Sequence, residues 1–231
     1  MSARPLGVAV IGAGGRTGRF ACELLCGASG FELVGELGRE HALASALREC
    51  GAVLALDLTV AGLGFEHGRI ALECGLRPVI GTSGVTRAES ARLDELARAR
   101  HLGGLVVPNF SLGMLMLQRA AEELVRRFPD VAIVELHHEK KKDAPSGTAR
   151  DTAERLRAAR GSERGEVPIA SVRLPGLYAH QEVLFGGAGE TLTLRHDMHG
   201  PAAFGPGILA ALAHAARAQG VAHGLAAALT P

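Results

Sequence analysis

The sequence of 231 residues is poor in aromatic residues and carries almost no net charge. It has no tryptophan, one tyrosine and seven phenylalanines, so aromatic residues make up 3% of the chain. Proteins that bind single-stranded nucleic acids stack bases on aromatic side chains, and that class of site is disfavoured here. Lysine and arginine number 25 against 24 aspartates and glutamates, a net charge of +1. We therefore expect no nucleic-acid partner, and any anion must be bound locally.

Cysteine is scarce as well. The four cysteines are Cys22, Cys26, Cys50 and Cys74, and no two of them form a C-x-x-C pair. Neither a zinc site nor a thiol redox motif is predicted, and all four are expected to be small buried apolar residues.

Long hydrophobic runs are absent too. The longest apolar stretch, residues 202–216, contains Pro206 and His214 and is too short to cross a bilayer. The apolar run near the N-terminus is interrupted by glycine and lacks the cleavage pattern of a signal peptide. We therefore expect a cytoplasmic protein with no membrane association.

Glycine, by contrast, is abundant, with 31 residues, about twice the usual share. In the first half of the chain, short apolar runs alternate with helical patterns, which is typical of a doubly wound parallel sheet of the Rossmann type. The predicted strands are residues 6–11, 31–37, 52–58, 78–80 and 104–107, and the predicted helices are residues 16–25, 41–49, 64–74 and 86–100.

In the second half, predicted strands and helices no longer alternate. Helices are predicted at residues 111–128 and 148–160, and strands at residues 131–137, 169–173, 181–185 and 191–195. Three strands in succession indicate a mixed, largely antiparallel open sheet in a second α+β domain. A last helix, residues 207–218, could close back on the first domain. We therefore predict an α/β chain with a dinucleotide-binding domain, residues 1–110 and 204–231, and a substrate domain, residues 111–203.

The first predicted strand runs into a glycine-rich loop. Gly12, Gly15 and Gly18 form a G-x-x-G-x-x-G pattern directly between a strand and a helix. Such glycines allow a tight turn, a close approach of the backbone to a pyrophosphate and close helix–strand packing, with the phosphates at the helix N-terminus. Glycine-rich turns also simply end strands, but at the first strand–helix turn of an alternating chain dinucleotide binding is the better interpretation.

The end of the second strand bears on the choice of cofactor. Rossmann domains usually place an acid there for the ribose hydroxyls of NAD, whereas an arginine can accept the 2′-phosphate of NADP. Here Gly38 stands at the position most favourable for an acid, and Arg39 follows it. NADPH is therefore favoured over NADH; the alternative is a solvated Arg39, with Glu36 or Glu40 on the ribose.

Two further loops follow strands of the first half, at the edge where open α/β sheets bind ligands. They are Gly81-Thr82-Ser83-Gly84 and Pro108-Asn109-Phe110-Ser111. Either could be an ordinary turn, but together they favour contact with the cofactor.

The segment from Glu135 to Thr148, E-L-H-H-E-K-K-K-D-A-P-S-G-T, concentrates two histidines, three lysines and a helix start. Ser146 or Asp143 can cap the helix, and the amides of Gly147 and Thr148 form an anion site. Imidazole beside ammonium is a workable proton donor near neutral pH. A structural histidine pair or a solvated lysine run would also fit, whereas a metal site is disfavoured because no further ligand lies at a suitable spacing.

These motifs together resemble the 4-hydroxy-tetrahydrodipicolinate reductase family, also called dihydrodipicolinate reductase. The resemblance rests on V-A-V-I-G-A-G-G-R-T-G at residues 8–18, D-L-T at 57–59, G-T-S-G at 81–84, P-N-F-S-L-G at 108–113 and, above all, the segment 135–148. It continues in order through V-R-L at 172–174, A-H-Q-E-V-L-F-G at 179–186, G-E-T-L at 189–192 and R-H-D at 195–197.

The resemblance implies hydride transfer from NADH or NADPH to a cyclic dicarboxylate in the diaminopimelate route to lysine, with loss of water, by a homotetramer assembled through the sheet of the second domain. His137 matches the general acid/base of the family and Lys141 its catalytic lysine, while His138, Gly147 and Thr148 match substrate contacts. The positions that match cofactor contacts are Gly12, Ala13, Gly14, Gly15, Arg16, Thr17, Arg39, Gly81, Thr82, Ser83, Pro108, Asn109 and Phe110. No metal is implied.

The sequence departs from the family pattern at several places. Gly38 replaces an acid, Val60-Ala61 replaces a polar residue and proline, and His199-Gly200-Pro201 replaces a segment that usually carries an arginine. Two other interpretations each explain part of the sequence. Another Rossmann dehydrogenase acting on a small imino or amino acid would explain the glycine loop but not the helix start at 143–148. A nucleotide-sensing regulator should carry a DNA-recognition surface, which the sequence does not show.

Overall fold

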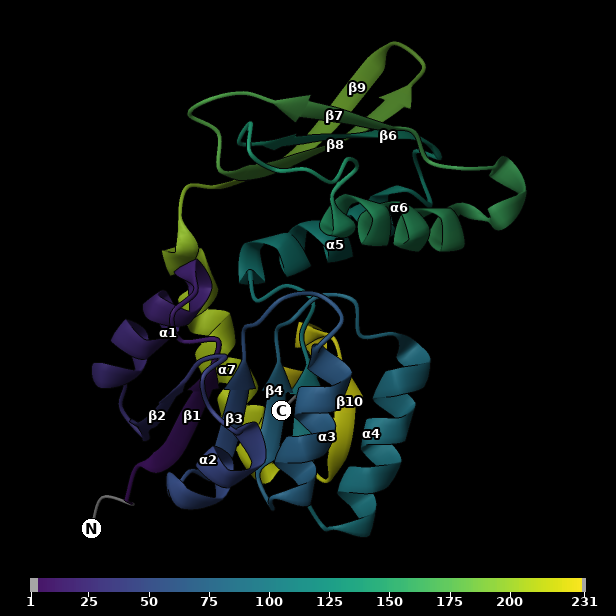
Figure 1. The fold of residues 1–231 in the computed structure, drawn as a ribbon. Helices are drawn as coiled ribbons and strands as arrows, with labels where there is room; N and C mark the ends of the chain where they lie inside the picture. Colours follow the sequence, from purple (N-terminus) through teal and green to yellow (C-terminus); the bar gives the residue numbers. More distant parts are fainter. Residues whose placement is uncertain (1–3, 230–231) are drawn as a thin grey trace. The chain divides into compact units, whose positions relative to one another are not determined.

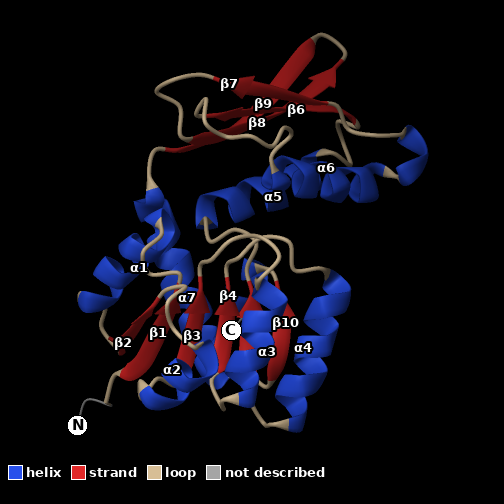
Figure 2. Ribbon diagram, viewed as in Figure 1, coloured by secondary structure: helices blue, strands red, loops and turns tan. Residues whose placement is uncertain are grey.

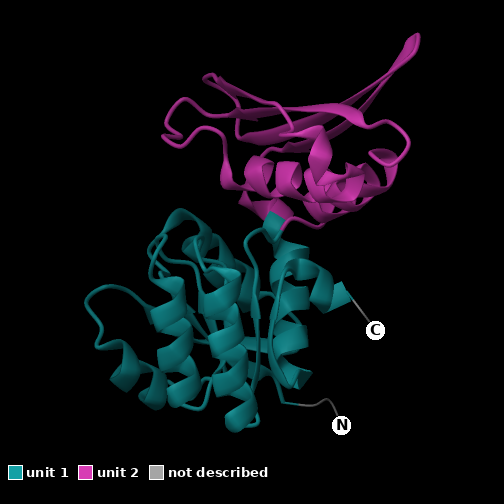
Figure 3. Ribbon diagram, turned by 90° about the vertical axis from the view of Figure 1, so that its right-hand side faces the viewer, with its two compact units in different colours: residues 1–110, 204–231 teal, residues 111–203 magenta. Residues whose placement is uncertain are grey.

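The computed structural model describes residues 4–229, and the chain divides into two compact units. The first unit comprises residues 1–110 and 204–231, and the second comprises residues 111–203 (Figure 3). Each unit has its own sheet and its own hydrophobic core.

The first unit is built on a six-stranded parallel sheet in the order β10-β5-β4-β3-β1-β2 (Figure 1). Its strands are β1 (Leu6–Ile11), β2 (Phe31–Leu37), β3 (Leu54–Asp57), β4 (Arg77–Ile80), β5 (Gly103–Val106) and β10 (Gly220–His223). β1 pairs with β2 on one side and β3 on the other, so the direction of winding reverses beside β1. Ligands of doubly wound sheets bind at the carboxyl ends of strands at such a reversal.

Helices cover both faces of this sheet (Figures 1 and 2). They are α1 (Arg16–Cys26), α2 (Leu43–Glu49), α3 (Gly64–Glu73), α4 (Arg87–Ala99) and α7 (Gly205–Arg217). α1 and α7 contact each other on one face, whereas α2, α3 and α4 pack in sequence on the other. The parallel doubly wound fold predicted for this half is confirmed.

The second unit has a four-stranded sheet in the order β7-β6-β8-β9. Its strands are β6 (Asp130–His137), β7 (Ile169–Arg173), β8 (Ala179–Gly187) and β9 (Glu190–Met198), and its helices are α5 (Leu112–Leu124) and α6 (Gly147–Arg160). β6 runs parallel to β7 and antiparallel to β8, which in turn is antiparallel to β9, so the predicted mixed sheet is confirmed. α5 and α6 cover one face, where Met114, Leu156 and Phe185 belong to a common core.

Several local expectations need correction. The helix predicted at residues 111–128 ends at Leu124, and residues 125–127 form a turn before Phe128. Strand β10 was not predicted at all: its four residues, G-V-A-H, carry little strand signal and owe their conformation to pairing with β5. The cysteines also differ from expectation, because only Cys22 is buried, while Cys26 is exposed and the other two are half-buried.

Candidate functional site

The glycine-rich loop between β1 and α1 has the shape of a cradle for an anion. Gly12 has a φ of +86°, a conformation that favours glycine. A Cβ on Gly18 would lie 2.1 Å from the carbonyl oxygen of Gly12, so the helix approaches the loop more closely than any side chain permits. A Cβ on Gly14 would meet nothing within 4 Å, which leaves the outer side of the loop open.

The N-terminus of α1 has no side-chain cap. Gly15 stands at the N-cap, and the first turn contains no acidic residue. By comparison, Ser111 and Ser146 cap α5 and α6 with their hydroxyl groups. Uncapped amides at the positive end of a helix fit the pyrophosphate of a dinucleotide, as the sequence predicts. Among the predicted contacts here, Ala13 is buried, Thr17 is half-buried, and Gly14, Gly15 and Arg16 are exposed.

The chain turns sharply after β2, at residues 38–41. The amide of Gly38 donates to Nδ1 of His41 at 3.0 Å, and His41 lies 3.2 Å from the carboxylate of Glu40. Arg39 is exposed on this turn. A Cβ on Gly38 would lie 2.4 Å from the Glu40 carboxylate, so the turn brings Glu40 close to the place where an acid at position 38 would stand.

The two remaining predicted cofactor segments lie together in the first unit. A Cβ on Gly81 would lie 2.4 Å from the ring of Phe110, so the aromatic ring packs directly over this glycine. Pro108 is exposed and Asn109 half-buried beside it. Thr82 is buried, whereas Ser83 is exposed.

The hydroxyl of Thr82 is used inside the protein. It accepts a hydrogen bond from the amide of Thr59 at 2.9 Å. The hydroxyl of Thr59 in turn donates to the buried carboxylate of Asp57 at 2.7 Å, and His67 lies 3.2 Å from the same oxygen. Thr82 therefore supports the loop with its side chain.

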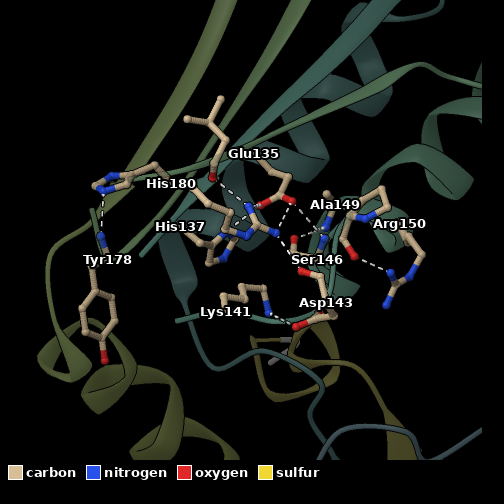
Figure 4. A network of polar contacts seen from close by, with 12 residues as sticks. Glu135, His137, Lys141, Asp143, Ser146, Ala149, Arg150, Tyr178 and His180 are labelled. Carbon is tan, nitrogen blue, oxygen red and sulfur yellow. Dashed lines mark hydrogen bonds and ion pairs between the residues drawn. The ribbon is translucent and has the colours of Figure 1, made fainter. Parts of the chain in front are cut away.

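In the second unit, the residues of the segment 135–148 gather at the end of β6 (Figure 4). Alternate residues of a strand point to the same face, so Glu135 and His137 share the face that α5 and α6 cover. Nδ1 of His137 lies 2.5 Å from Oε2 of Glu135. The Glu135 side chain is fully buried and that of His137 is 14% exposed, so this contact is well shielded from water.

Arg173, at the end of β7, completes this arrangement. Its Nη2 donates to Oε1 of Glu135 at 2.7 Å and its Nη1 to Oε2 at 3.0 Å, a bidentate ion pair. The backbone amide of Ser146 donates to the same Oε1 at 3.2 Å. One buried carboxylate thus joins β6, β7 and the start of α6.

The two titratable groups respond differently to this environment. Burial lowers the pKa of His137, and the positive charges of Lys141 and Arg173 act in the same direction against the opposing effect of Glu135. Burial raises the pKa of Glu135, but hydrogen bonds from Arg173, Ser171 and His137 outweigh it and hold that pKa below its usual value. Glu135 is therefore ionised, and His137 exchanges a proton below its ordinary pKa of about 6.5.

The helix start at Ser146 is built as the sequence predicts. The hydroxyl of Ser146, not the carboxylate of Asp143, accepts from the amide of Ala149 at 3.2 Å and caps α6. Gly147 is exposed, and a Cβ there would meet only Nη2 of Arg150, at 4.0 Å. Packing does not require glycine at this position, because the space that a Cβ would occupy is open.

The lysines and the second histidine lie in the loop before α6. The ammonium of Lys141 donates to Asp143 at 2.8 Å. Lys140 and Lys142 are exposed, while His138 and Thr148 are half-buried. The structure therefore brings His137, Lys141 and the helix start into one network, with Lys141 and Asp143 side by side in Figure 4.

Sequence reasoning missed two members of this network, Glu135 and Arg173. The E-x-H spacing at 135–137 was a usable signal for Glu135, because the period of a strand places both side chains on one face. Arg173 lies 38 positions from Glu135 and carried no local signal. Within residues 4–229, no group of three histidine, cysteine or acidic side chains is placed to hold a metal ion, and no helix is long and apolar enough to cross a membrane.

Comparisons with known proteins cover both units. The family model "Dihydrodipicolinate reductase, N-terminus" matches residues 6–110, and the model "Dihydrodipicolinate reductase, C-terminus" matches residues 111–229. A 4-hydroxy-tetrahydrodipicolinate reductase from Lactococcus lactis subsp. cremoris (strain MG1363) is 44% identical over 230 residues, which covers 87% of this chain and 88% of the relative. A protein of the same name from Coxiella burnetii (strain Dugway 5J108-111) is 41% identical over 205 residues, 83% of this chain and 86% of the relative.

A solved structure agrees with these relatives. Dihydrodipicolinate reductase from Paenisporosarcina sp. TG-14, with dipicolinate bound, matches with a TM-score of 0.84 and 33% sequence identity. The match covers 96% of this chain and 98% of that protein, so the likeness includes both units.

Proposed function

Because this chain belongs to the dihydrodipicolinate reductase family, we propose which of its residues carry out the reaction of that family. The chain is an oxidoreductase of the diaminopimelate route to lysine, and it reduces 4-hydroxy-tetrahydrodipicolinate to tetrahydrodipicolinate. The reaction consumes one reduced pyridine nucleotide and one proton and releases water. The family resemblance inferred from the sequence motifs is thus confirmed.

The observation that carries the assignment of roles is the contact of His137 with Glu135. A histidine with one nitrogen on a buried carboxylate keeps its other nitrogen available for a proton transfer. His137 therefore serves as the general acid/base, as the resemblance implies. A positioned acid of this kind typically contributes about 10²- to 10⁴-fold to a rate.

The start of α6 is suited to a substrate carboxylate. The amides of Gly147 and Thr148 lie at the positive end of a 14-residue helix, and the space above Gly147 is open. Lys141 and His138, in the loop before the helix, add positive charge or hydrogen-bond donors. The relative from Paenisporosarcina binds dipicolinate, a planar dicarboxylate, and a dicarboxylate substrate agrees with this anion site.

The first unit is suited to the cofactor, which supplies the hydride. Residues 12–17 form the cradle for the pyrophosphate. Arg39, exposed on the turn after β2, accepts the 2′-phosphate of NADPH, which makes NADPH the favoured nucleotide over NADH. Residues 81–83 and 108–110 contact the cofactor further along the edge of the sheet.

The second unit also supports a homotetramer. Val134, Leu136, Val172 and Leu184 occupy partly exposed positions on the sheet face opposite the one that α5 and α6 cover. A second copy of this chain would cover that apolar face, as the family resemblance implies. Sedimentation velocity tests the assembly: a monomer at micromolar concentration would contradict it. The cytoplasmic location remains a prediction.

One assay tests the function directly. The substrate is prepared fresh from pyruvate and aspartate semialdehyde with the aldolase-type synthase, and loss of NADPH or NADH absorbance is followed after the protein is added. We expect rapid oxidation that depends on the synthase product, and a rate about 10²- to 10⁴-fold lower with His137→Ala. Failure to oxidise either nucleotide would overturn the assignment.

A further inference from the structure

The carboxylate of Glu135 is held on both oxygens by neighbouring residues. Oε1 accepts from Arg173 Nη2 and from the amide of Ser146, and Oε2 accepts from Arg173 Nη1 and faces Nδ1 of His137. The side chain of Ser171 also hydrogen-bonds this carboxylate. A fully buried carboxylate paired with a guanidinium is ionised and can only accept.

The state of His137 follows from this. Because Oε2 can only accept, Nδ1 of His137 must carry a hydrogen. In the neutral ring the lone pair is then on Nε2, and in the charged ring the transferable proton is on Nε2. The identity of the reactive nitrogen is therefore set by a residue that need not touch the substrate.

Arg173 also contacts the later part of the segment 135–148. Besides Glu135, its Nη2 donates to the backbone carbonyl of Asp143 at 2.7 Å. Asp143 pairs with Lys141, and Ser146 caps the helix whose amides face the anion site. The buried ion pair of Glu135 and Arg173 thus contacts His137, the backbone of Asp143 and the start of α6 at Ser146.

We propose that Glu135 and Arg173 are positioning residues of the reductase: their buried ion pair selects Nε2 of His137 as the proton-transfer atom and fixes it relative to the start of α6. This inference rests on the proposed role of His137. Neither residue is a catalytic residue in the sense of contact with substrate or cofactor.

The pair also balances the charge around His137. Three charged groups of the described chain act on its ring: Glu135 on β6, Arg173 on β7 and Lys141 in the loop after β6. Against the effect of burial, Glu135 raises the pKa of His137, and Arg173 and Lys141 lower it. Removing one partner or the other should therefore move the pKa of His137 in opposite directions.

Histidine side-chain nitrogen NMR on the full-length protein tests the assignment without any need for activity. The chain has 10 histidines, and His137→Asn identifies the signal of interest. In the neutral form we expect hydrogen on Nδ1 and none on Nε2. Glu135→Gln should lower the pKa of His137 by about one pH unit, and Arg173→Met should raise it by about as much.

Removing one member of a buried ion pair can unfold a protein, whereas replacing both members by apolar residues is often neutral for stability. The double variant Glu135→Met/Arg173→Met therefore tests the role of the pair in a folded protein. We expect it to bind NADPH normally, to lose the fixed tautomer and to have kcat reduced by about 10- to 10⁴-fold, the range seen where a carboxylate orients a functional histidine. The matched control is Glu122→Gln, which breaks a glutamate–arginine pair with Arg155 elsewhere in the second unit, and it should retain wild-type kcat.

Three results would overturn the proposal. Two come from the NMR experiment: hydrogen on Nε2 in the neutral wild-type ring, or pKa changes in the same direction for both single variants. Wild-type kcat in the double variant would do so as well. Because the NMR result needs no turnover, it separates this inference from the proposed function. A reductase assay that fails while the NMR expectations hold would remove the function and leave the positioning network.

Discussion

The ammonium of Lys141 is paired with a carboxylate of its own loop: its Nζ lies 2.8 Å from Oδ1 of Asp143. Asp143 is 52% exposed, and a pair of this kind contributes about 0.2–1 kcal/mol to stability. A substrate carboxylate can therefore displace Asp143 at little cost. The hydrogen bond from Lys141 also lowers the pKa of Asp143, so the competing carboxylate stays charged at neutral pH.

This competition predicts the effect of Asp143→Asn. Removing the negative charge should tighten the binding of dipicolinate by up to about fivefold at low salt, and the gain should shrink as salt screens the charges. Isothermal titration calorimetry at two ionic strengths measures this. Asp151→Asn, which removes the partner of Arg155 on α6, is the control with unchanged affinity. Weaker binding in Asp143→Asn would mean that Asp143 orients Lys141 and does not compete with the substrate.

The pH dependence of the reaction follows from His137. As an acid, it must be protonated in the free enzyme, and burial places its pKa below the ordinary value. We therefore expect kcat/KM to fall as pH rises through a pKa below about 6.5. His137→Ala should remove this limb and reduce kcat by about 10²- to 10⁴-fold while the affinity for NADPH is retained. Weakened cofactor binding with unchanged turnover would place His137 outside the chemistry.

Gly147→Ala separates substrate binding from stability. The added methyl group meets no packed atom, and the loss of glycine flexibility in the first turn of α6 should keep or slightly raise the melting temperature. The same methyl group covers the amide that would hold a carboxylate, so KM for the substrate should rise by about 10- to 100-fold, the value of one hydrogen bond to a charged group. Gly186→Ala, also uncrowded but on β8, should leave KM unchanged. An unaltered KM in Gly147→Ala would remove this amide from the substrate site.

The candidate sites of the two units differ in how far the sequence predicts them. The glycine loop, the fold class and the ranges of most strands follow from local patterns, because each depends on residues close together in the chain. Ser146 was foreseen as one of two possible caps for the same reason. Arg173 was not, because its ion pair with Glu135 exists only when β7 lies beside β6. The short strand β10 was missed on the same grounds, since its conformation comes from pairing with β5.

Arg39→Ala tests the choice of nucleotide. If its guanidinium holds the 2′-phosphate, its loss should raise KM for NADPH by about 10- to 100-fold and leave KM for NADH within about twofold, because only NADPH carries that phosphate. Arg48→Ala, an exposed arginine near the end of α2, controls for a general loss of positive charge. Equal increases in KM for NADPH and NADH would mean that Arg39 contacts a part of the molecule that both nucleotides share. That result would refute the 2′-phosphate contact.

Gly18→Ala tests the cradle itself. The new Cβ would lie 2.1 Å from the Gly12 carbonyl, so α1 must move away from the loop, and the amides that face the pyrophosphate move with it. We expect the dissociation constant of NADPH, measured by fluorescence titration, to rise at least about tenfold, since close approach of the backbone is what a dinucleotide requires there.

Gly27→Ala is the control for this variant. It adds a methyl group at the other end of α1, where the nearest atom is 4.0 Å away, and should bind NADPH normally. The dissociation constant of dipicolinate, measured alone, should be unchanged in both variants, because the predicted carboxylate site is built from residues of the second unit. Normal NADPH binding by Gly18→Ala would mean that the cofactor does not depend on this loop.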